Sequence, residues 1–208
     1  MKEHDEGLAR AGVSREAADM LTHYIGMLKK WNPVINLVSR SSLHDVWRRH
    51  VLDSLQVWNL AKIHEGKIVD LGSGGGFPGV PIAIIAKAKG ADVSTTLVES
   101  DQRKATFLAE VVRELALDTQ VLNCRIEDVE PLGANCVTAR ALAPLHVLLG
   151  FADRHLSGDG AALFLKGGAA PLELEAARQR WRFDVLFHQS ETDQSGRILE
   201  VSGISRAA

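Results

Sequence analysis

The run from Asp70 to Gly79 places an acid before a loop with five glycines in eight residues. Such a loop lets a ligand approach the backbone, because glycine has no Cβ and readily adopts positive φ. Asp70-x-Gly72-x-Gly74-x-Gly76 is typical of S-adenosylmethionine (SAM) sites, whereas Gly74-x-Gly76-x-x-Gly79 matches the dinucleotide fingerprint. A purely structural loop is disfavoured, because so many glycines are costly to order.

Four residues around this loop could contact a cofactor. Asp70 could reach the methionine ammonium of SAM, a cation that a nicotinamide cofactor lacks. Glu99 ends the next strand-like run, 23 residues after Gly76, where it could accept hydrogen bonds from ribose hydroxyls of either cofactor. A helix N-terminal acid beside a Ser100 cap is its alternative role. Ile126 and Glu127 follow the third strand, where we expect backbone groups to hold an adenine edge.

The segment after the fourth predicted strand bears on the methyl acceptor. It reads Ala139-Arg140-Ala141-Leu142, whereas an exocyclic amine methylase would carry an Asn/Asp-Pro-Pro-aromatic run there. An acceptor with a lone pair and no proton needs alignment and no general base for its methylation. We expect Arg140 to orient the methyl acceptor and to help fix the cofactor. An ordinary salt bridge at the strand end is the alternative.

Composition narrows the class of protein. The chain has 208 residues, 46% of them hydrophobic, and a formal net charge of −2. No apolar run approaches the ~20 residues of a membrane span, and the polar start at Met1 is unlike a signal peptide. Cys124 and Cys136 are expected to be reduced core residues, and the absence of metal-ligand spacing argues against a metal site. We therefore expect a cytoplasmic, monomeric protein.

The charge is unevenly distributed along the chain. Between Lys29 and His50 there are five Lys or Arg residues and one acid, Asp45, which gives this segment a net charge of +4. Trp31 and Trp47 are interleaved with the basic residues. Basic residues with aromatics suit a phosphate-contacting surface, and a solvated helix face with core tryptophans is the alternative.

Hydrophobic periodicity predicts helices in the first third of the chain. One helix is expected from a Ser14 cap to Trp31, where Asn32-Pro33 should stop it, and a second from about Leu43 to Leu60 with Ser42 as its cap. His50-x-x-Asp53 lies on one face of this second helix, either holding the extension against the sheet or touching substrate.

From Lys67 onward, strands and helices alternate. Strand-like runs occupy residues 67–71, 92–98, 119–123, 135–139, 160–166, 183–188 and 197–203, with helix-like runs near 80–89, 101–116, 142–156 and 170–181. This alternation predicts a doubly wound sheet, and the last two strands, with no helix between them, predict the terminal antiparallel pair of class I SAM methyltransferases. We expect an α/β fold with a seven-stranded, mostly parallel sheet: residues 1–62 form a helical extension and 63–208 a Rossmann-like SAM-binding domain.

Six motifs occur in order over residues 25–170. They are Asn36-Leu37-Val38-Ser39-Arg40, His50-x-x-Asp53-Ser54-Leu55, the glycine loop, Val98-Glu99-Ser100 with Lys104-x-x-Phe107-Leu108, Thr138-Ala139-Arg140-Ala141-x-Ala143-Pro144-Leu145 and Leu165-Lys166-Gly167-Gly168. This series resembles the bacterial small-subunit rRNA guanine-N7 methyltransferase family, RsmG or GidB. The resemblance implies SAM as methyl donor and N7 of guanine 527, in the 530 loop of 16S rRNA, as acceptor.

The resemblance also assigns residues by position. The family's SAM contacts fall on Gly72, Phe77, Ile126, Glu127 and Arg140. With the residues argued above, the predicted cofactor site comprises Asp70, Gly72, Gly74, Phe77, Glu99, Ile126, Glu127 and Arg140. The predicted catalytic residues are Arg140 and Lys166, and the predicted RNA contacts are Asn36, Arg40, Arg48, Arg49 and Lys166. The expected partner is 16S rRNA or the small ribosomal subunit.

Three other functions stay open on the sequence. A SAM-dependent enzyme acting on another RNA, a protein or a small molecule would leave the basic segment merely solvated. An NAD-dependent oxidoreductase would use the later glycine spacing. The chain offers no obvious Tyr-Lys or His-Asp pair for hydride transfer, since its only tyrosine, Tyr24, lies outside the Rossmann part. A non-enzymatic RNA-binding protein would keep a vestigial SAM fold.

Overall fold

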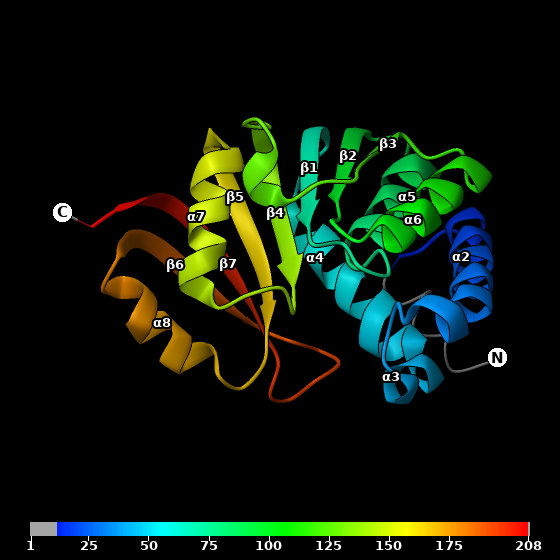
Figure 1. Ribbon diagram of the computed structural model, residues 1–208, viewed down its shortest axis with the longest axis horizontal. Helices are drawn as coiled ribbons and strands as arrows, with labels where there is room; N and C mark the ends of the chain where they lie inside the picture. Colours follow the sequence, from blue (N-terminus) through cyan, green and yellow to red (C-terminus); the bar gives the residue numbers. More distant parts are fainter. Residues whose placement is uncertain (1–11, 208) are drawn as a thin grey trace.

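The computed structural model describes residues 12–207, which form a seven-stranded sheet flanked by helices (Figure 1). The strands are β1 (Glu65–Leu71), β2 (Asp92–Val98), β3 (Thr119–Leu122), β4 (Ala134–Arg140), β5 (Leu156–Lys166), β6 (Trp181–Gln189) and β7 (Arg197–Arg206). Their order in the sheet is β3-β2-β1-β4-β5-β7-β6, and β7 is antiparallel to both of its neighbours. The predicted class I SAM methyltransferase architecture, with its terminal antiparallel pair, is confirmed.

Helical segments precede and connect the strands. They are α2 (Arg15–Ile35), α3 (Arg40–His44), the π-helix η1 (Trp47–Leu52), α4 (Asp53–Ala61), α5 (Gly79–Lys89), α6 (Gln102–Glu114), the 3₁₀-helix η2 (Ile126–Asp128), α7 (Leu145–His155) and α8 (Ala170–Arg178). Among them, α5 is buried along its first eight residues, which explains why its sequence lacks a polar face.

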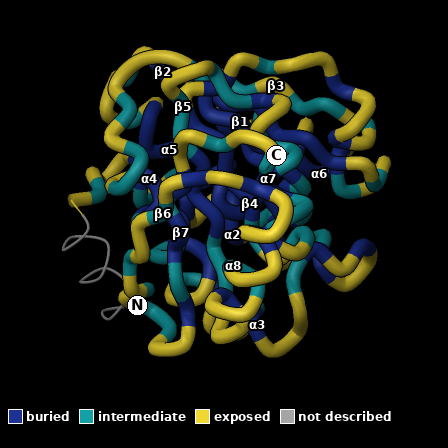
Figure 2. The backbone as a smooth tube through the Cα atoms, turned by 90° about the vertical axis from the view of Figure 1, so that its left-hand side faces the viewer, coloured by how far each residue is buried: buried dark blue, intermediate teal, exposed yellow. Residues whose placement is uncertain are grey.

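The sheet separates two hydrophobic layers. In Figure 1, α2, α5 and α6 lie together on one side of the molecule, and α7 and α8 lie on the other. Successive residues of β1 point to opposite layers, so that Ile68 packs with the first group of helices and Val69 with the second. Figure 2 shows the buried segments in the interior and the exposed backbone mainly in loops. Burial on both faces accounts for the nearly continuous apolar runs of the central strands.

The prediction that Asn32-Pro33 ends the first helix is wrong. Helix α2 begins after the Ser14 cap as predicted, but it includes Pro33 and continues to Ile35. It ends at Asn36, whose left-handed backbone (φ 48°) directs its N–H to the Asn32 carbonyl. Asparagine tolerates this conformation better than most residues, so the stop signal lies three residues beyond the proline.

The second predicted helix is divided into three pieces, and its predicted cap is wrong. Ser39, not Ser42, caps α3 by accepting a hydrogen bond from the Ser42 N–H. The π-helix η1 then intervenes before α4, which adds a wider turn around His50. The buried residues of this region include Val46, His50, Val51, Ser54, Val57 and Trp58.

Within residues 12–207, no helix combines the length and the apolar composition needed to cross a membrane.

Candidate functional site

The glycine loop joins β1 to α5 at the carboxyl edge of the sheet. Gly72, Gly74 and Gly76 adopt positive φ values of 65°, 57° and 98°, which confirms why glycine occupies them. The loop is tied to β2, because the N–H groups of Gly72 and Ser73 both donate to the Val98 carbonyl at 2.9 and 3.1 Å. The loop therefore has a defined shape that leaves its backbone open to a ligand.

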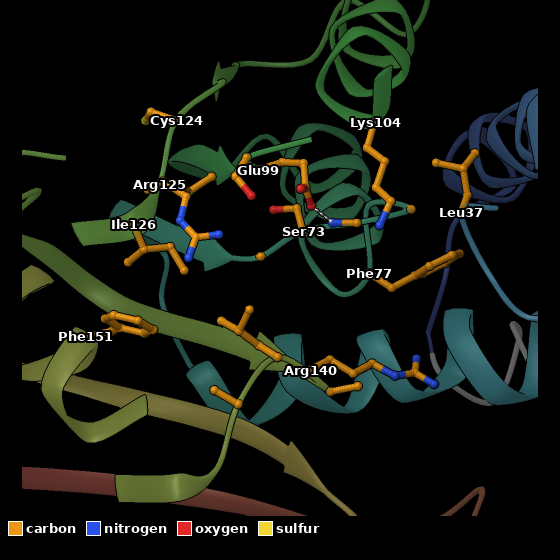
Figure 3. A pocket seen from close by; sticks show the side chains of 18 of the residues that line it. Leu37, Ser73, Phe77, Glu99, Lys104, Cys124, Arg125, Ile126, Arg140 and Phe151 are labelled. Carbon is orange, nitrogen blue, oxygen red and sulfur yellow. Dashed lines mark hydrogen bonds between the residues drawn. The ribbon is translucent and has the colours of Figure 1, made fainter. Parts of the chain in front are cut away.

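A cavity of about 590 Å³ opens over this loop, within the range of ligand sites for nucleoside-sized molecules. Seven of the eight predicted cofactor residues line it: Gly72, Gly74, Phe77, Glu99, Ile126, Glu127 and Arg140. Figure 3 shows Glu99, Ser73 and Lys104 on one side of this space, with Arg140 and Phe151 on the opposite side. Residues from four strand ends thus meet at one site, as parallel strands require.

Glu99 lies at the centre of one cavity wall and is 7% exposed. Its carboxylate accepts one hydrogen bond from the Gly74 N–H and one from the Asp101 N–H, each at 2.8 Å. A carboxylate has about four acceptor positions, so it can still accept from the hydroxyls of a ligand. Ser100 is not the helix cap, since Asp101 accepts from the N–H groups of Arg103 and Lys104. This frees Glu99 from a capping role.

Asp70 is not among the residues that line the cavity. It is fully buried behind the loop, where its carboxylate accepts hydrogen bonds from the Thr138 hydroxyl (2.8 Å) and the Gly79 N–H (3.3 Å). These contacts connect β1, β4 and the start of α5. The structure therefore places Asp70 as a support of the loop, and its predicted contact with the methionine ammonium would need a rearrangement or a bridging water.

Burial raises the pKa of Asp70 to about 6, despite the opposing hydrogen bonds from Thr138, Ser73 and Gly79. Because the folded protein holds this proton more tightly than the unfolded chain, the contribution of Asp70 to stability is largest below pH 4 and falls as the pH rises to 6. We expect wild type to lose up to about 3 kcal/mol relative to Asp70→Asn between pH 4 and pH 7. Urea unfolding of both proteins across this range measures the difference. Parallel pH profiles would contradict it.

The helical extension forms the wall of the cavity opposite β3. The Tyr24 hydroxyl of α2 donates to the Gly75 carbonyl at 2.5 Å, although the two residues are 51 positions apart in sequence. Leu37 and Val38 line the cavity, and the backbone of Leu37 lies against Gly75. Sequence reasoning missed these contacts, because no local motif connects a helix residue such as Tyr24 to a distant loop.

Arg140 ends β4 and connects the sheet to the extension. Its Nη2 donates to the Arg49 carbonyl at 2.7 Å and lies 3.8 Å from the Asp53 carboxylate. Burial lowers the pKa of Arg140, while the Asp53 charge opposes this effect, so the guanidinium stays cationic. Its Nη1 is buried without a partner among residues 12–207. The salt bridge expected as the alternative exists, and the buried Nη1 is the atom whose hydrogen bond is not satisfied within the described residues.

The β6–β7 loop contacts α4 of the extension, which the sequence did not indicate. Asp53 accepts hydrogen bonds from the Ser190 and Thr192 hydroxyls, and the Glu191 N–H donates to the Gln56 side chain at 2.9 Å. Asp53 therefore connects α4, Arg140 and the C-terminal hairpin. This bears out the interpretation that it holds the extension against the sheet.

Lys166 does not reach the cavity. Its ammonium pairs with the Glu173 carboxylate at 2.6 Å and donates to the Ala143 carbonyl at 2.8 Å, and only 9% of its side chain is exposed. Both contacts hold the segment after β4 against α8. The structure thus assigns Lys166 a role in positioning the Ala141–Pro144 segment and leaves no geometric support for a direct contact with phosphate.

The other predicted RNA contacts lie at the surface of the extension. Asn36, Arg40, Arg48 and Arg49 are exposed, and the loop after α2 is held by Asn32, whose side chain accepts from the Val38 N–H at 2.9 Å. Arg48 and Arg49 belong to the same π-helical turn as His50, a cavity residue. This places positive charge next to the cavity entrance.

The two cysteines are free, as predicted. Burial raises the pKa of Cys136 to about 12, so it is an unreactive core thiol. Cys124 follows β3 and lines the cavity, which the sequence did not indicate. Among residues 12–207, no group of three His, Cys, Asp or Glu side chains could hold a metal ion.

Comparison with known proteins identifies the family of the chain. The sequence model of the GidB family, rRNA small subunit methyltransferase G, matches residues 17–198. The chain is 46% identical to the ribosomal RNA small subunit methyltransferase G of Ruegeria sp. (strain TM1040), over 93% of this chain and 94% of that protein. It is also 46% identical to the protein of the same name from Paramagnetospirillum magneticum, over 97% and 96%.

Solved structures show the same fold at low sequence identity. A SAM-dependent methyltransferase from Aquifex aeolicus superposes with a TM-score of 0.58 at 14% identity, covering 85% of this chain and 97% of that one. TYW2 from M. jannaschii, solved in complex with AdoMet, gives a TM-score of 0.52 at 14% identity over 74% and 77%.

Proposed function

The chain belongs to the GidB family of rRNA small subunit methyltransferase G proteins, and we propose that it methylates N7 of guanine 527 in 16S rRNA with SAM as donor. The observation that supports this most is the meeting of seven predicted cofactor residues in one cavity, with Arg140 at its rim. The basic surface of the extension lies beside the same cavity.

The cavity fits SAM by its chemistry. The glycine loop packs so closely that a Cβ at Gly72 or Gly76 would collide with neighbouring side chains, which fixes its shape beside the cavity, and Glu99 has acceptor positions free for ribose hydroxyls. Ile126 and Glu127 would flank the adenine, and Phe77 offers an apolar surface at the opposite side of the cavity, near Leu37 (Figure 3). SAM, when bound, supplies an electrophilic methyl group on a sulfonium.

The residues of this chain would act by alignment. Guanine N7 needs no deprotonation, so the rate depends on holding the base in line with the methyl group in a site with little water. Arg140 is a cation that lines the cavity, and its buried Nη1 has no partner among residues 12–207, which suits a guanine O6 or a phosphate as acceptor. A bidentate grip on O6 and N7 would block the reacting atom, so Arg140 is proposed to contact only one acceptor group of the base.

The test is transfer of labelled methyl from SAM to small ribosomal subunits that lack the modification. Recovery of label as 7-methylguanosine at position 527, after nuclease digestion and mapping, is the expected result. Label in another nucleoside or position would keep the methyltransferase and overturn the acceptor. Transfer to naked 16S rRNA alone would identify free RNA as the substrate.

The basic surface gives a separate prediction. Replacing exposed Arg40 and Arg48 with alanine should lower RNA affinity about tenfold and reduce the slope of log K against log salt by about 2. The control is Lys89→Ala with Arg182→Ala, which removes the same charge from exposed positions on α5 and β6. Filter binding across salt concentrations measures both pairs. Equal slopes for the two pairs would mean that the basic surface is merely solvated.

A further inference from the structure

His50 is a buried cavity residue that the proposed function has not used. It belongs to the π-helical turn η1 and is 8% exposed. Its ring stacks on Phe77, with ring centroids 4.7 Å apart and planes 25° from parallel. The Ser54 hydroxyl donates to its carbonyl at 2.6 Å and stabilises this turn. Since π-helical turns are often found at functional sites, the conformation of this segment directs attention to its buried histidine.

Both ring nitrogens of His50 lack a hydrogen-bond partner. Several buried side-chain N and O atoms in residues 12–207 have none, and those from cavity-lining residues are Nδ1 and Nε2 of His50 and Nη1 of Arg140. Burying a polar atom without a partner is unfavourable, so three such atoms at one cavity indicate a polar ligand group that meets them. The two residues are close enough that the Arg140 charge acts on the imidazole.

His50 offers an acceptor as well as a donor. Burial, with the cations of Arg140 and Arg49, lowers the pKa of His50 to about 3, so its ring is neutral at physiological pH. A neutral imidazole has one N–H and one unprotonated nitrogen, whereas Arg140 is only a donor. His50 can therefore accept a hydrogen bond and Arg140 can donate one, and both residues line the same cavity.

The Watson–Crick edge of guanine complements this pair. It carries the acceptor O6 at one end, next to N7, and the donor 2-amino group at the other end, away from N7. Adenine presents a donor where guanine has O6 and lacks the 2-amino group, so it would leave the partners unsatisfied. A site that leaves buried polar groups unpaired with the wrong base discriminates strongly.

We propose that His50 is a specificity-determining residue that accepts a hydrogen bond from the 2-amino group of the acceptor guanine, while Arg140 donates to its O6. The inference rests on the proposed function and names the residue that selects the base. The ring of Phe77 stacks on the face of the imidazole and supports it in this position.

The experiment couples a change in His50 to a change in the base. Small subunits are reconstituted with 16S rRNA that carries either guanosine or inosine at position 527, because inosine lacks only the 2-amino group. Wild type is expected to lose about tenfold or more in kcat/KM with inosine. His50→Phe keeps an aromatic ring beside Phe77 and should be slower on guanosine, but it should lose less than twofold on changing to inosine. His50→Gln, which retains an acceptor, should recover part of the rate and of the discrimination.

SAM affinity and the thermal midpoint of each variant separate recognition from folding, and both are expected to stay close to wild type for His50→Gln. An equal inosine penalty in wild type and His50→Phe would overturn the proposal. Wild-type enzyme that treats guanosine and inosine alike would overturn it without any variant. Absence of 7-methylguanosine from wild type with guanosine subunits would instead overturn the proposed function.

Discussion

Replacing Arg140 with alanine is expected to lower the rate of methyl transfer to small ribosomal subunits by about a hundredfold to a thousandfold. Arg140 lies at the end of β4, its side chain is 22% exposed, and its buried Nη1 has no hydrogen-bond partner among residues 12–207. Its loss removes both the proposed contact with the base and the bond to the Arg49 carbonyl that holds the extension. Single-turnover transfer of labelled methyl at saturating SAM measures the effect.

The control is Arg140→Lys, which keeps the charge but not the planar fork of donors. We expect it to recover less than a tenth of the wild-type rate, because one ammonium cannot serve the Arg49 carbonyl and a ligand in the same geometry. Circular dichroism and the thermal midpoint verify that Arg140→Ala stays folded, since Asp53 retains Ser190 and Thr192 as partners. An alanine variant that is folded and within threefold of the wild-type rate would contradict the proposed role.

Gly76→Ala is expected to destabilise the protein by about 3 kcal/mol and to abolish SAM binding. Gly76 has a φ of 98°, and a Cβ there would lie 2.7 Å from Val80 Cγ2 and 2.9 Å from the Tyr24 hydroxyl. Both neighbours are fully buried, so the loop would have to move away from α2. Urea unfolding measures the stability, and isothermal titration calorimetry with SAM measures the binding.

Two other glycines provide matched controls. Gly74 shares the positive φ, but the nearest atom to its Cβ would be 3.8 Å away, so Gly74→Ala reports backbone strain alone. Gly158 has open space around it and an ordinary φ, and Gly158→Ala should change stability by less than about 0.5 kcal/mol. If Gly76→Ala were no more destabilising than Gly74→Ala, the close packing between the loop and α2 would be without energetic importance.

The glycine loop, the acid Glu99 and the order of the elements were predictable because each depends on short stretches of chain. Backbone positions that need positive φ select glycine, and buried strands at regular intervals select apolar runs. Since parallel strands end at the same edge, the residues that follow β1, β2, β3 and β4 had to meet. Family resemblance then predicted which of these residues would contact the cofactor.

The wrong predictions of helix ends and caps in the helical extension have one cause, the weakness of the local sequence signals there. Pro33 was expected to end a helix, but its missing N–H is tolerated in the last turn before Asn36. The π-helix around His50 was not predictable, because its extra residue per turn is stabilised by packing on Phe77 and by the carbonyl bond from Ser54.

The tertiary structure alone decided what the charged and polar side chains do. By themselves, the spacings in the sequence predicted a ligand-binding glycine loop on a doubly wound sheet, and the last two strands and the family resemblance favoured SAM over a dinucleotide. They could not show that the Asp70 carboxylate accepts a hydrogen bond from the loop, or that Lys166 forms an ion pair with Glu173. Nor could they show that the Tyr24 hydroxyl donates a hydrogen bond to the Gly75 carbonyl. Backbone conformation is encoded mainly by near neighbours, whereas the partners of a buried polar group are chosen by packing between segments far apart in the chain.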